Sequence, residues 1–265
     1  MTSIFRDGIL SGKAALVTGG GTGIGATISL ELARAGADVA LLSRDAAHLS
    51  GVRDAIERLG RRAVALPCDV REAAAVERAV GEAEAALGGL DILVNGAAGN
   101  FPCAAEKLSP NGFRAVIEID LVGTFLCSKA AHAAFVRRGG GVIINITATL
   151  DYQGLPFQVH AGSAKAGIDA MTRHLGSEWG PRNIRVVAIA PGPVAETEGV
   201  RRLCAGREDK LAAEIPLRRM STKDEIAALA VFLCSSAAAS ITGTTIVVDG
   251  GQRLRSSFWA SDAAP

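Results

Sequence analysis

Short apolar runs alternate along the chain with longer stretches in which apolar residues recur every three to four positions. The runs are five to seven residues long and rich in Val, Leu, Ile and Ala, which is typical of strands buried on both faces of a sheet. They cover residues 13–18, 37–43, 63–67, 90–95, 142–146, 184–189 and 244–248. The longer stretches predict helices over residues 26–35, 45–59, 71–87, 109–137, 157–179 and 222–235.

Strands and helices follow one another without a linker, a repeat or a low-complexity segment. This alternation predicts the α/β class, because two adjacent parallel strands need a helical crossover between them. We expect a single doubly wound parallel sheet of the Rossmann type with helices on both faces, in one domain over residues 1–265. Residues 198–216 are polar and irregular, and they predict a loop that covers a substrate site.

The first apolar run leads into a glycine-rich loop and then into a helix. Glycines let the backbone approach a pyrophosphate closely, and the free N–H groups of a helix N-terminus attract its charge. This order of elements predicts a dinucleotide site contacted by Gly19, Thr22, Gly23, Ile24 and Gly25. The alternative is a simple tight turn.

The end of the second strand carries Ser43 and Arg44. An NAD-specific site usually has an acidic residue there, which binds the ribose 2′-hydroxyl. A hydroxyl and a guanidinium suit a 2′-phosphate instead, so the sequence favours NADPH over NADH. Asp45 follows at once and is expected to cap the next helix.

Three further loops leave strands at their carboxyl ends, the edge where ligands bind in open α/β sheets. In the first, Asp69 either hydrogen-bonds an adenine amino group or caps the next helix. The second, residues 95–101, has small side chains suited to passing close to a flat cofactor. Together these loops predict cofactor contacts at Asp69, Val70, Asn95, Ala97, Pro191, Gly192 and Val194.

Composition and charge exclude several classes of function. A net charge of +1 gives no basic excess for nucleic acid. The five cysteines are scattered without Cys-x-x-Cys spacing, which predicts free thiols in a reducing compartment and no metal site. The N-terminus lacks the apolar core of a signal peptide, and the apolar tract of residues 226–241 is interrupted by serines. With no Ser-Lys-Leu type of ending, we expect a cytoplasmic protein without a membrane partner.

The motifs above, together with Lys165, resemble those of the short-chain dehydrogenase/reductase family from about residue 10 to residue 251. Within this family, four segments are similar to the 2,4-dienoyl-CoA reductases, especially the peroxisomal type. They are Ala-Ala-Gly-Asn-Phe (97–101), Glu-Ile-Asp (118–120), Asn-Ile-Thr-Ala-Thr (145–149) and Gln-Val-His-Ala-Gly-Ser-Ala-Lys (158–165). The resemblance implies NADPH-dependent reduction of a 2,4-dienoyl-CoA to a 3-enoyl-CoA in unsaturated fatty acid degradation. It also implies an acyl-CoA substrate and a homotetramer.

The sequence departs from the family pattern at the usual carbonyl-reducing pair. Ala148 takes the place of the usual catalytic serine, and Ala161 that of the usual tyrosine, one helical turn before Lys165. Asp120 stands where most of the family has asparagine, and the peroxisomal-type reductases share this aspartate. Tyr152, the only tyrosine, lies two residues beyond the position that the mitochondrial-type reductases use, and we expect it to line the pocket.

The missing acid is intelligible for a conjugated dienoyl thioester. Hydride would add at the far δ-carbon, negative charge would accumulate on the thioester oxygen, and a water could protonate the dienolate at carbon. We assign Lys165 to hold the nicotinamide ribose and to supply positive potential near that charge. Asp120 would orient the water, or would only form an internal ion pair with Lys165.

Four residues are expected to contact the substrate. Asn100 and Thr147 are candidate hydrogen-bond donors, while Phe101 and Phe157 are candidate walls for the acyl chain, with core packing as the alternative. His160 is expected to be structural.

Two other groups of residues allow interpretations about partners. Arg53, Arg58, Arg61 and Arg62 could meet coenzyme A phosphates or solvent. An apolar helix face with Ile168, Met171 and Leu175 favours self-association.

Two other functions fit the same pattern. One is a reductase of another conjugated carbonyl compound, and the other is a catalytically silent NADPH-binding protein. The presence of Asp120, Lys165 and the glycine loop in one chain favours an enzyme.

Overall fold

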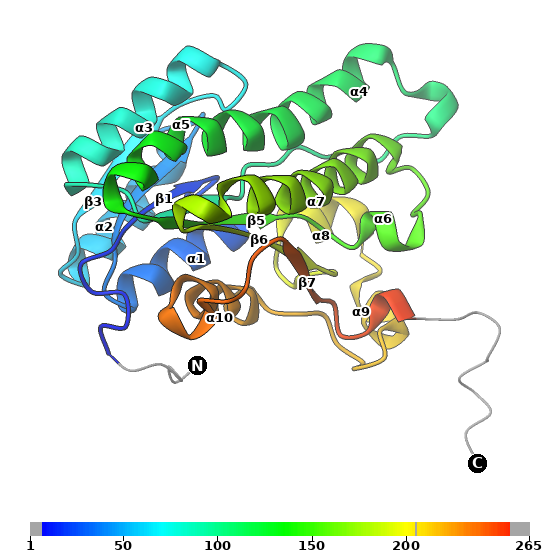
Figure 1. The fold of residues 1–265 in the computed structure, drawn as a ribbon. Coiled ribbons are helices and arrows are strands. Elements are labelled where there is room, and N and C mark those ends of the chain that lie inside the picture. The colour runs from blue at the N-terminus through cyan, green and yellow to red at the C-terminus, as the bar shows by residue number, and fades with distance from the viewer. Residues whose placement is uncertain (1–6, 205, 255–265) are drawn as a thin grey trace.

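Seven parallel strands form the central sheet, in the order β3-β2-β1-β4-β5-β6-β7 (Figure 1). The computed structural model describes residues 7–204 and 206–254. The strands are β1 (Ala14–Thr18), β2 (Asp38–Ser43), β3 (Ala63–Pro67), β4 (Ile92–Asn95), β5 (Gly141–Ile146), β6 (Ile184–Pro191) and β7 (Thr244–Val248). The strand order reverses between β1 and β4, which confirms the predicted doubly wound α/β fold and puts its ligand crevice at the carboxyl ends of these strands.

Helices cover both faces of the sheet. α1 (Gly23–Arg34), α2 (Ala47–Arg58) and α10 (Lys223–Cys234) pack on one face, and α3 (Ala73–Leu87), α5 (Gly123–Arg138) and α7 (Val159–Trp179) on the other (Figure 1). The side chains of β1 alternate between the two cores, because successive residues of a strand point to opposite faces. The inner strands are buried on both faces and read as largely apolar runs, whereas the edge strands β3 and β7 are only partly buried.

The helix face that favoured self-association lies inside the molecule. Ile168 and Leu175 of α7 are only 1% and 7% exposed, and Met171 packs against the same core. The burial of this face removes its support for self-association, which stays a prediction. Exposed apolar side chains occur on α5 instead, where Phe125 and Val136 are 44% and 36% exposed.

Residues 198–216, expected to be irregular, contain two short helices, α8 (Glu198–Cys204) and α9 (Glu208–Glu214). Ion pairs one helical turn apart support α8, since Glu198 binds both Arg201 at 2.7 Å and Arg202 at 2.8 Å. A short helix α6 (Leu150–Gln153) also interrupts the segment between β5 and α7.

The long helical stretch predicted over residues 109–137 is present but changes its winding in the middle. α4 (Pro110–Ile117) passes into a π-helical turn, η2 (Glu118–Val122), and then into α5. In this turn the Gly123 N–H donates to the Glu118 carbonyl five residues back. Such turns occur frequently at functional sites, and this one contains Asp120.

This stretch, Pro110–Arg138, is long and apolar enough to span a membrane by length and mean hydropathy, which is 1.3. Its α5 part packs Cys127, Ala131 and Phe135 into the core between the sheet and the helices α3, α5 and α7. The contacts are those of a core helix.

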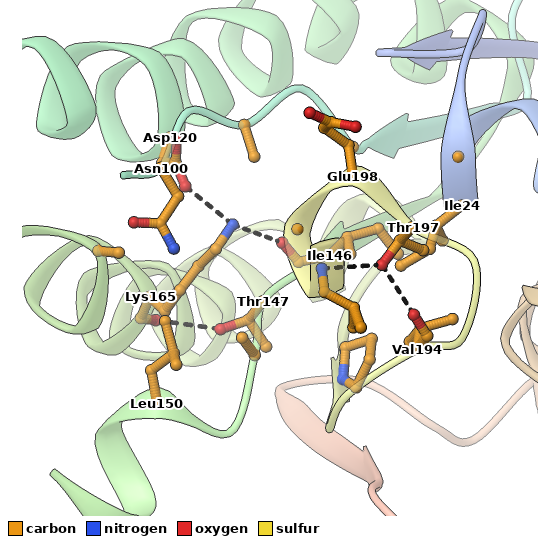
Figure 2. A pocket seen from close by; sticks show the side chains of 18 of the residues that line it. Ile24, Asn100, Asp120, Ile146, Thr147, Leu150, Lys165, Val194, Thr197 and Glu198 are labelled. Atoms are coloured by element: carbon orange, nitrogen blue, oxygen red, sulfur yellow. Dashed lines mark hydrogen bonds and ion pairs between the residues drawn. The ribbon is translucent and has the colours of Figure 1, made fainter. Parts of the chain in front are cut away.

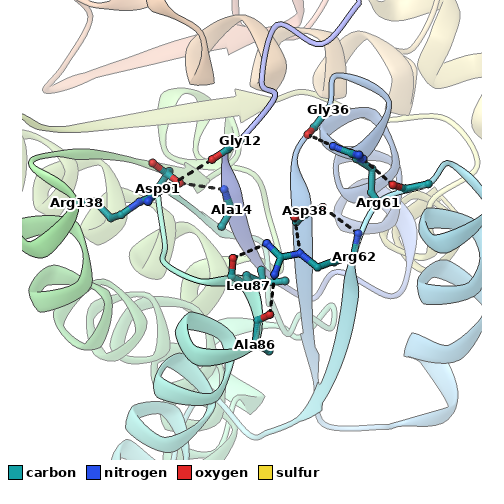
Figure 3. Close-up of polar contacts among 11 residues, drawn as sticks. Gly12, Ala14, Gly36, Asp38, Arg61, Arg62, Ala86, Leu87, Asp91 and Arg138 are labelled. Carbon is teal, nitrogen blue, oxygen red and sulfur yellow. Dashed lines mark hydrogen bonds and ion pairs between the residues drawn. The ribbon is translucent and has the colours of Figure 1, made fainter.

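Arginines secure the opposite edge of the sheet, where the strands begin (Figure 3). Arg62 binds Asp38 and the carbonyls of Ala86 and Leu87, and Arg61 binds the Gly36 carbonyl. These two side chains therefore hold backbone together far from the ligand edge, and they are not available for coenzyme A phosphates.

Candidate active site

A cavity of about 1440 Å³ opens at the carboxyl ends of the strands. Loops after β1, β2, β3, β4, β5 and β6 line it, together with η2, α7, α8 and α9. Ligand pockets usually enclose about 300–1,000 Å³, so this cavity has room for a dinucleotide and a second large ligand.

The glycine loop needs glycine for two reasons: positive φ angles at Gly19 and Gly23, and close backbone contacts at Gly19 and Gly25. Gly19 and Gly23 have φ angles of 67° and 52°, which favour glycine. A Cβ at Gly25 would collide with the Gly19 carbonyl oxygen, and one at Gly19 would lie 2.8 Å from the Gly96 carbonyl oxygen. Thr22, Gly23 and Ile24 line the cavity at the start of α1, and this cradle fits a pyrophosphate at a helix N-terminus.

The end of the cavity formed by β2 and β3 carries the residues expected at the adenosine. Ser43, Arg44, Asp69 and Val70 all line it. Asp69 accepts from the Arg71 N–H at 3.0 Å and forms an ion pair with its guanidinium at 2.6 Å. Arg71 thereby holds the pKa of Asp69 below its usual value. Asp69 thus supports its own turn, while the adenine contact stays a prediction.

Asn95 was expected to face the cofactor, but its side chain is turned into the protein. Its amide donates to the Ser128 hydroxyl at 3.0 Å and to Asn145 Oδ1 at 2.9 Å, and the residue is 3% exposed. Asn145 in turn donates to Thr172 at 2.9 Å. The amide therefore links β4 and β5 to α5 and α7 below the cavity, and it does not line it.

Small residues of the other loops do reach the cavity. Ala97 lines it after β4, and Pro191, Gly192 and Val194 line it after β6. The Thr18 hydroxyl accepts from the N–H groups of Gly96 and Ala97, which fixes the loop after β4.

Asp120 and Lys165 meet in the wall of the cavity (Figure 2). Lys165 Nζ lies 3.0 Å from Asp120 Oδ2 and donates to the Ile146 carbonyl at 3.1 Å. Asp120 Oδ1 accepts from the Gly99 N–H at 2.7 Å. The side chain of Lys165 is only 9% exposed and that of Asp120 only 2%, so each charge depends on the other for compensation. The internal ion pair is therefore present, and it lies within the cavity.

Ala148 and Ala161 line the same cavity, so methyl groups occupy the places of the usual serine and tyrosine. Tyr152 also lines it, as expected, but is 44% exposed and lies under the Arg253 guanidinium at 5.8 Å. Burial raises the pKa of its hydroxyl, and the nearby carboxylate of Asp169 raises it further. A raised pKa makes the phenol a weaker acid.

The four residues expected at the substrate separate into two pairs. Asn100 and Thr147 line the cavity, and the Thr147 hydroxyl donates to the Lys165 carbonyl at 3.3 Å. Phe101 and Phe157 do not line it. Phe101 packs on the His160 ring at 4.6 Å, and Phe157 is 58% exposed. The contact of the two phenylalanines with substrate stays a prediction.

Several lining residues were not singled out in the sequence. Leu203, Leu211 and Ile215 reach the cavity from α8, α9 and the following loop, and Arg253 reaches it from η5 (Gln252–Leu254). The apolar residues recurring within residues 198–216 were the signal for an amphipathic cover. Thr197 also lines the cavity, and its hydroxyl donates to the Val194 carbonyl at 2.7 Å (Figure 2).

Asp169 is a buried carboxyl one turn beyond Lys165 on α7, and it is 4% exposed. Oδ1 accepts from the Thr245 hydroxyl at 2.9 Å, while Oδ2 is buried without a hydrogen-bond partner in the described residues. Burial raises the pKa of Asp169 to about 6 despite the hydrogen bond from Thr245.

Comparison with known proteins identifies the family. A family model described as enoyl-(acyl carrier protein) reductase matches residues 19–253, which is most of the chain. The chain belongs to the short-chain dehydrogenase/reductase family. A peroxisomal 2,4-dienoyl-CoA reductase ((3E)-enoyl-CoA-producing) of Danio rerio is 45% identical over 258 residues, which are 96% of this chain and 86% of that protein.

Two solved structures support the same family. A citronellol catabolism dehydrogenase of Pseudomonas aeruginosa PAO1 has a TM-score of 0.84 at 37% identity, over 96% of this chain and 100% of that one. A 7α-hydroxysteroid dehydrogenase complexed with NADH and 7-oxo glycochenodeoxycholic acid has a TM-score of 0.88 at 32% identity, over 94% and 98%. The protein is thus an oxidoreductase of the short-chain family, and its cofactor is a nicotinamide dinucleotide.

Proposed function

We propose that the protein reduces 2,4-dienoyl-CoA thioesters to 3-enoyl-CoA with NADPH, as a step in the degradation of unsaturated fatty acids. One observation carries the proposal. The cavity holds a buried Asp120–Lys165 pair, while Ala148 and Ala161 leave it without the usual acid for a carbonyl oxygen. The relatives named as 2,4-dienoyl-CoA reductases support the substrate.

The choice of NADPH rests on the end of β2. Ser43 and Arg44 line the cavity where an NAD-specific site would carry a carboxylate. An arginine beside a hydroxyl can bind a 2′-phosphate through charge-assisted hydrogen bonds. Bound NADPH supplies the hydride.

Lys165 carries three N–H donors. Asp120 and the Ile146 carbonyl take two of them, and the third remains for the nicotinamide ribose. The ammonium also supplies positive potential to the negative charge that develops on the thioester oxygen after hydride adds at the δ-carbon. We assign the direct hydrogen bond to that oxygen to the amide of Asn100, which lines the cavity.

The last step places a proton on the α-carbon of the dienolate. We assign Asp120 to orient the water that delivers it, because each carboxylate oxygen can accept more than one hydrogen bond. Gly99 and Lys165 hold the carboxylate from two sides, so its position does not depend on the substrate. The hydroxide left behind recovers a proton from solvent through the open cavity.

Assembly and location belong to the same proposal. Exposed Phe125 and Val136 on α5 support a homotetramer, which a mass measurement in solution will test. The five cysteines are free thiols, and three of them are buried, which supports a reducing compartment such as the cytoplasm.

The test is NADPH oxidation with a medium-chain 2,4-dienoyl-CoA, run beside a 3-ketoacyl-CoA and with NADH as second cofactor. Turnover of the dienoyl thioester alone, with a 3-enoyl-CoA product, supports the proposal. Turnover of another conjugated carbonyl compound instead would favour the second candidate, a reductase that uses the same hydride geometry on a different substrate. NADPH binding without turnover of either class would leave a silent nucleotide-binding protein.

A further inference from the structure

The first turn of α7 is fastened to the loop after β4 by three contacts. Asn100 Nδ2 donates to Gln158 Oε1 at 2.7 Å. The Cys103 N–H donates to the Phe157 carbonyl at 3.1 Å, and the Phe101 ring packs on His160 at 4.6 Å. The loop that carries Asn100 is therefore held by the helix that carries Lys165.

The side chain of Gln158 serves this contact rather than its own helix. Gln158 is the N-cap residue that precedes α7, but its side chain makes no hydrogen bond to the first turn of the helix. It is 5% exposed, so its carbonyl oxygen points to Asn100 inside the protein. A partly buried amide pair of this kind fixes orientation, because turning either amide alone would face two N–H groups or two oxygens toward each other.

Asn100 keeps hydrogen-bonding capacity that the protein does not use. Its Oδ1 is buried and has no partner in the described residues, and its Nδ2 has a second N–H beyond the one given to Gln158. Because Asn100 lines the cavity, this second N–H is available to an occupant of the cavity. Reversing both amides together would still leave an N–H of Asn100 free.

We propose that Gln158 is a positioning residue: it orients the amide of Asn100 so that one N–H points at the thioester carbonyl oxygen of the substrate. This inference rests on the proposed function. Gln158 does not line the cavity, so it acts through Asn100 alone. The Gly99 N–H bond to Asp120 fixes the neighbouring backbone, which leaves the side-chain amide as the part that needs a second restraint.

The test is a double-mutant cycle of Gln158→Leu and Asn100→Ala. Loss of one neutral hydrogen bond that orients a donor corresponds to about a tenfold lower kcat/KM for a dienoyl-CoA in Gln158→Leu. In the Asn100→Ala background the same change should have no further effect, because there is no amide left to orient. Ser163→Ala, an exposed position on the same helix, is the matched control and should behave as wild type.

A spectroscopic readout separates positioning from a merely structural role. The absorption of a conjugated dienoyl thioester shifts to longer wavelength when its carbonyl oxygen accepts a strong hydrogen bond. With NADP⁺ present, wild type should produce this shift, and Gln158→Leu should produce a smaller one at saturating ligand. Equal shifts, or additive losses in the cycle, would overturn the role of Gln158 while leaving the reductase intact. A wild type that neither binds nor reduces the thioester would overturn both proposals.

Discussion

Replacing Lys165 with methionine tests how much the protein depends on the pair at its active centre. Methionine keeps the length of the side chain and is a good helix former, so packing and helix propensity change little. The change removes the ammonium from a carboxylate that is 2% exposed and leaves the Gly99 N–H as its one described donor. The perturbation is therefore mainly the loss of one charge from a buried pair.

The magnitude follows from burial. Removing one partner of a buried ion pair costs about 3–5 kcal/mol, because the other charge stays uncompensated. One kcal/mol lowers the melting temperature of a protein of this size by about 2–4 °C, so the expected drop is roughly 6–20 °C. The double variant Lys165→Met, Asp120→Asn has no charge left, and asparagine can still accept from Gly99. It should return to within about 1 kcal/mol of wild type.

Urea unfolding of the four proteins of this cycle, followed by circular dichroism, measures the free energies. Lys129→Met, an exposed lysine on α5, is the control and should change stability by less than about 0.5 kcal/mol. Activity should be lost in all three active-site variants. A single variant destabilised by less than about 1 kcal/mol, or a double variant with additive losses, would refute the account of a mutually dependent pair.

Three further predictions concern other sites. Because the pKa of Asp169 in the folded protein, about 6, exceeds its ordinary value of 3.8, the folded state binds the extra proton and stability falls as pH rises from about 4 to about 6. Between pH 4 and pH 8, the free energy of unfolding of Asp169→Asn, measured with urea, should therefore rise relative to that of wild type by up to about 3 kcal/mol. A difference between the two proteins that does not change with pH would contradict the raised pKa. Arg44→Asp should weaken the binding of NADPH about 10- to 100-fold and leave the binding of NADH unchanged, as measured by fluorescence titration. Equal losses of affinity for both cofactors would contradict the assignment of Arg44 to the 2′-phosphate. Gly25→Ala should abolish NADPH binding through its clash with the Gly19 carbonyl, whereas Gly51→Ala, which meets open space, should bind normally.

Local patterns were sufficient for the sheet and the cofactor loops. The inner strands are buried on both faces, so their apolar runs stand out from the neighbouring sequence. For all seven strands the predicted ends differ from the observed ones by at most two residues. The glycine loop was equally clear, because close backbone approach leaves no alternative to glycine at Gly19 and Gly25. The apolar runs and the contact between Gly25 and Gly19 depend on neighbours in sequence.

Features that depend on contacts between distant parts of the chain were harder to predict from the sequence. The pairing of Asp120 with Lys165 joins η2 to α7, and sequence reasoning left it open beside the role in water orientation, which stays a proposal. The direction of the Asn95 side chain depends on Ser128 and Asn145, which compete for its amide from other elements. The helices α8 and α9 were missed because short helices are stabilised by packing and ion pairs more than by their own propensity.

The π-helical turn at Glu118–Val122 has a consequence for how this active site can change. Such a turn accommodates one residue more than the α-helix on either side of it. Deleting a single residue there would restore regular winding and change the direction in which the side chains of the turn point, while the flanking helices α4 and α5 would keep their relative orientation. Asp120 would then leave Gly99 and Lys165 although every catalytic side chain was still encoded. The number of residues in this turn is thus as important for the active site as the identity of its catalytic side chains.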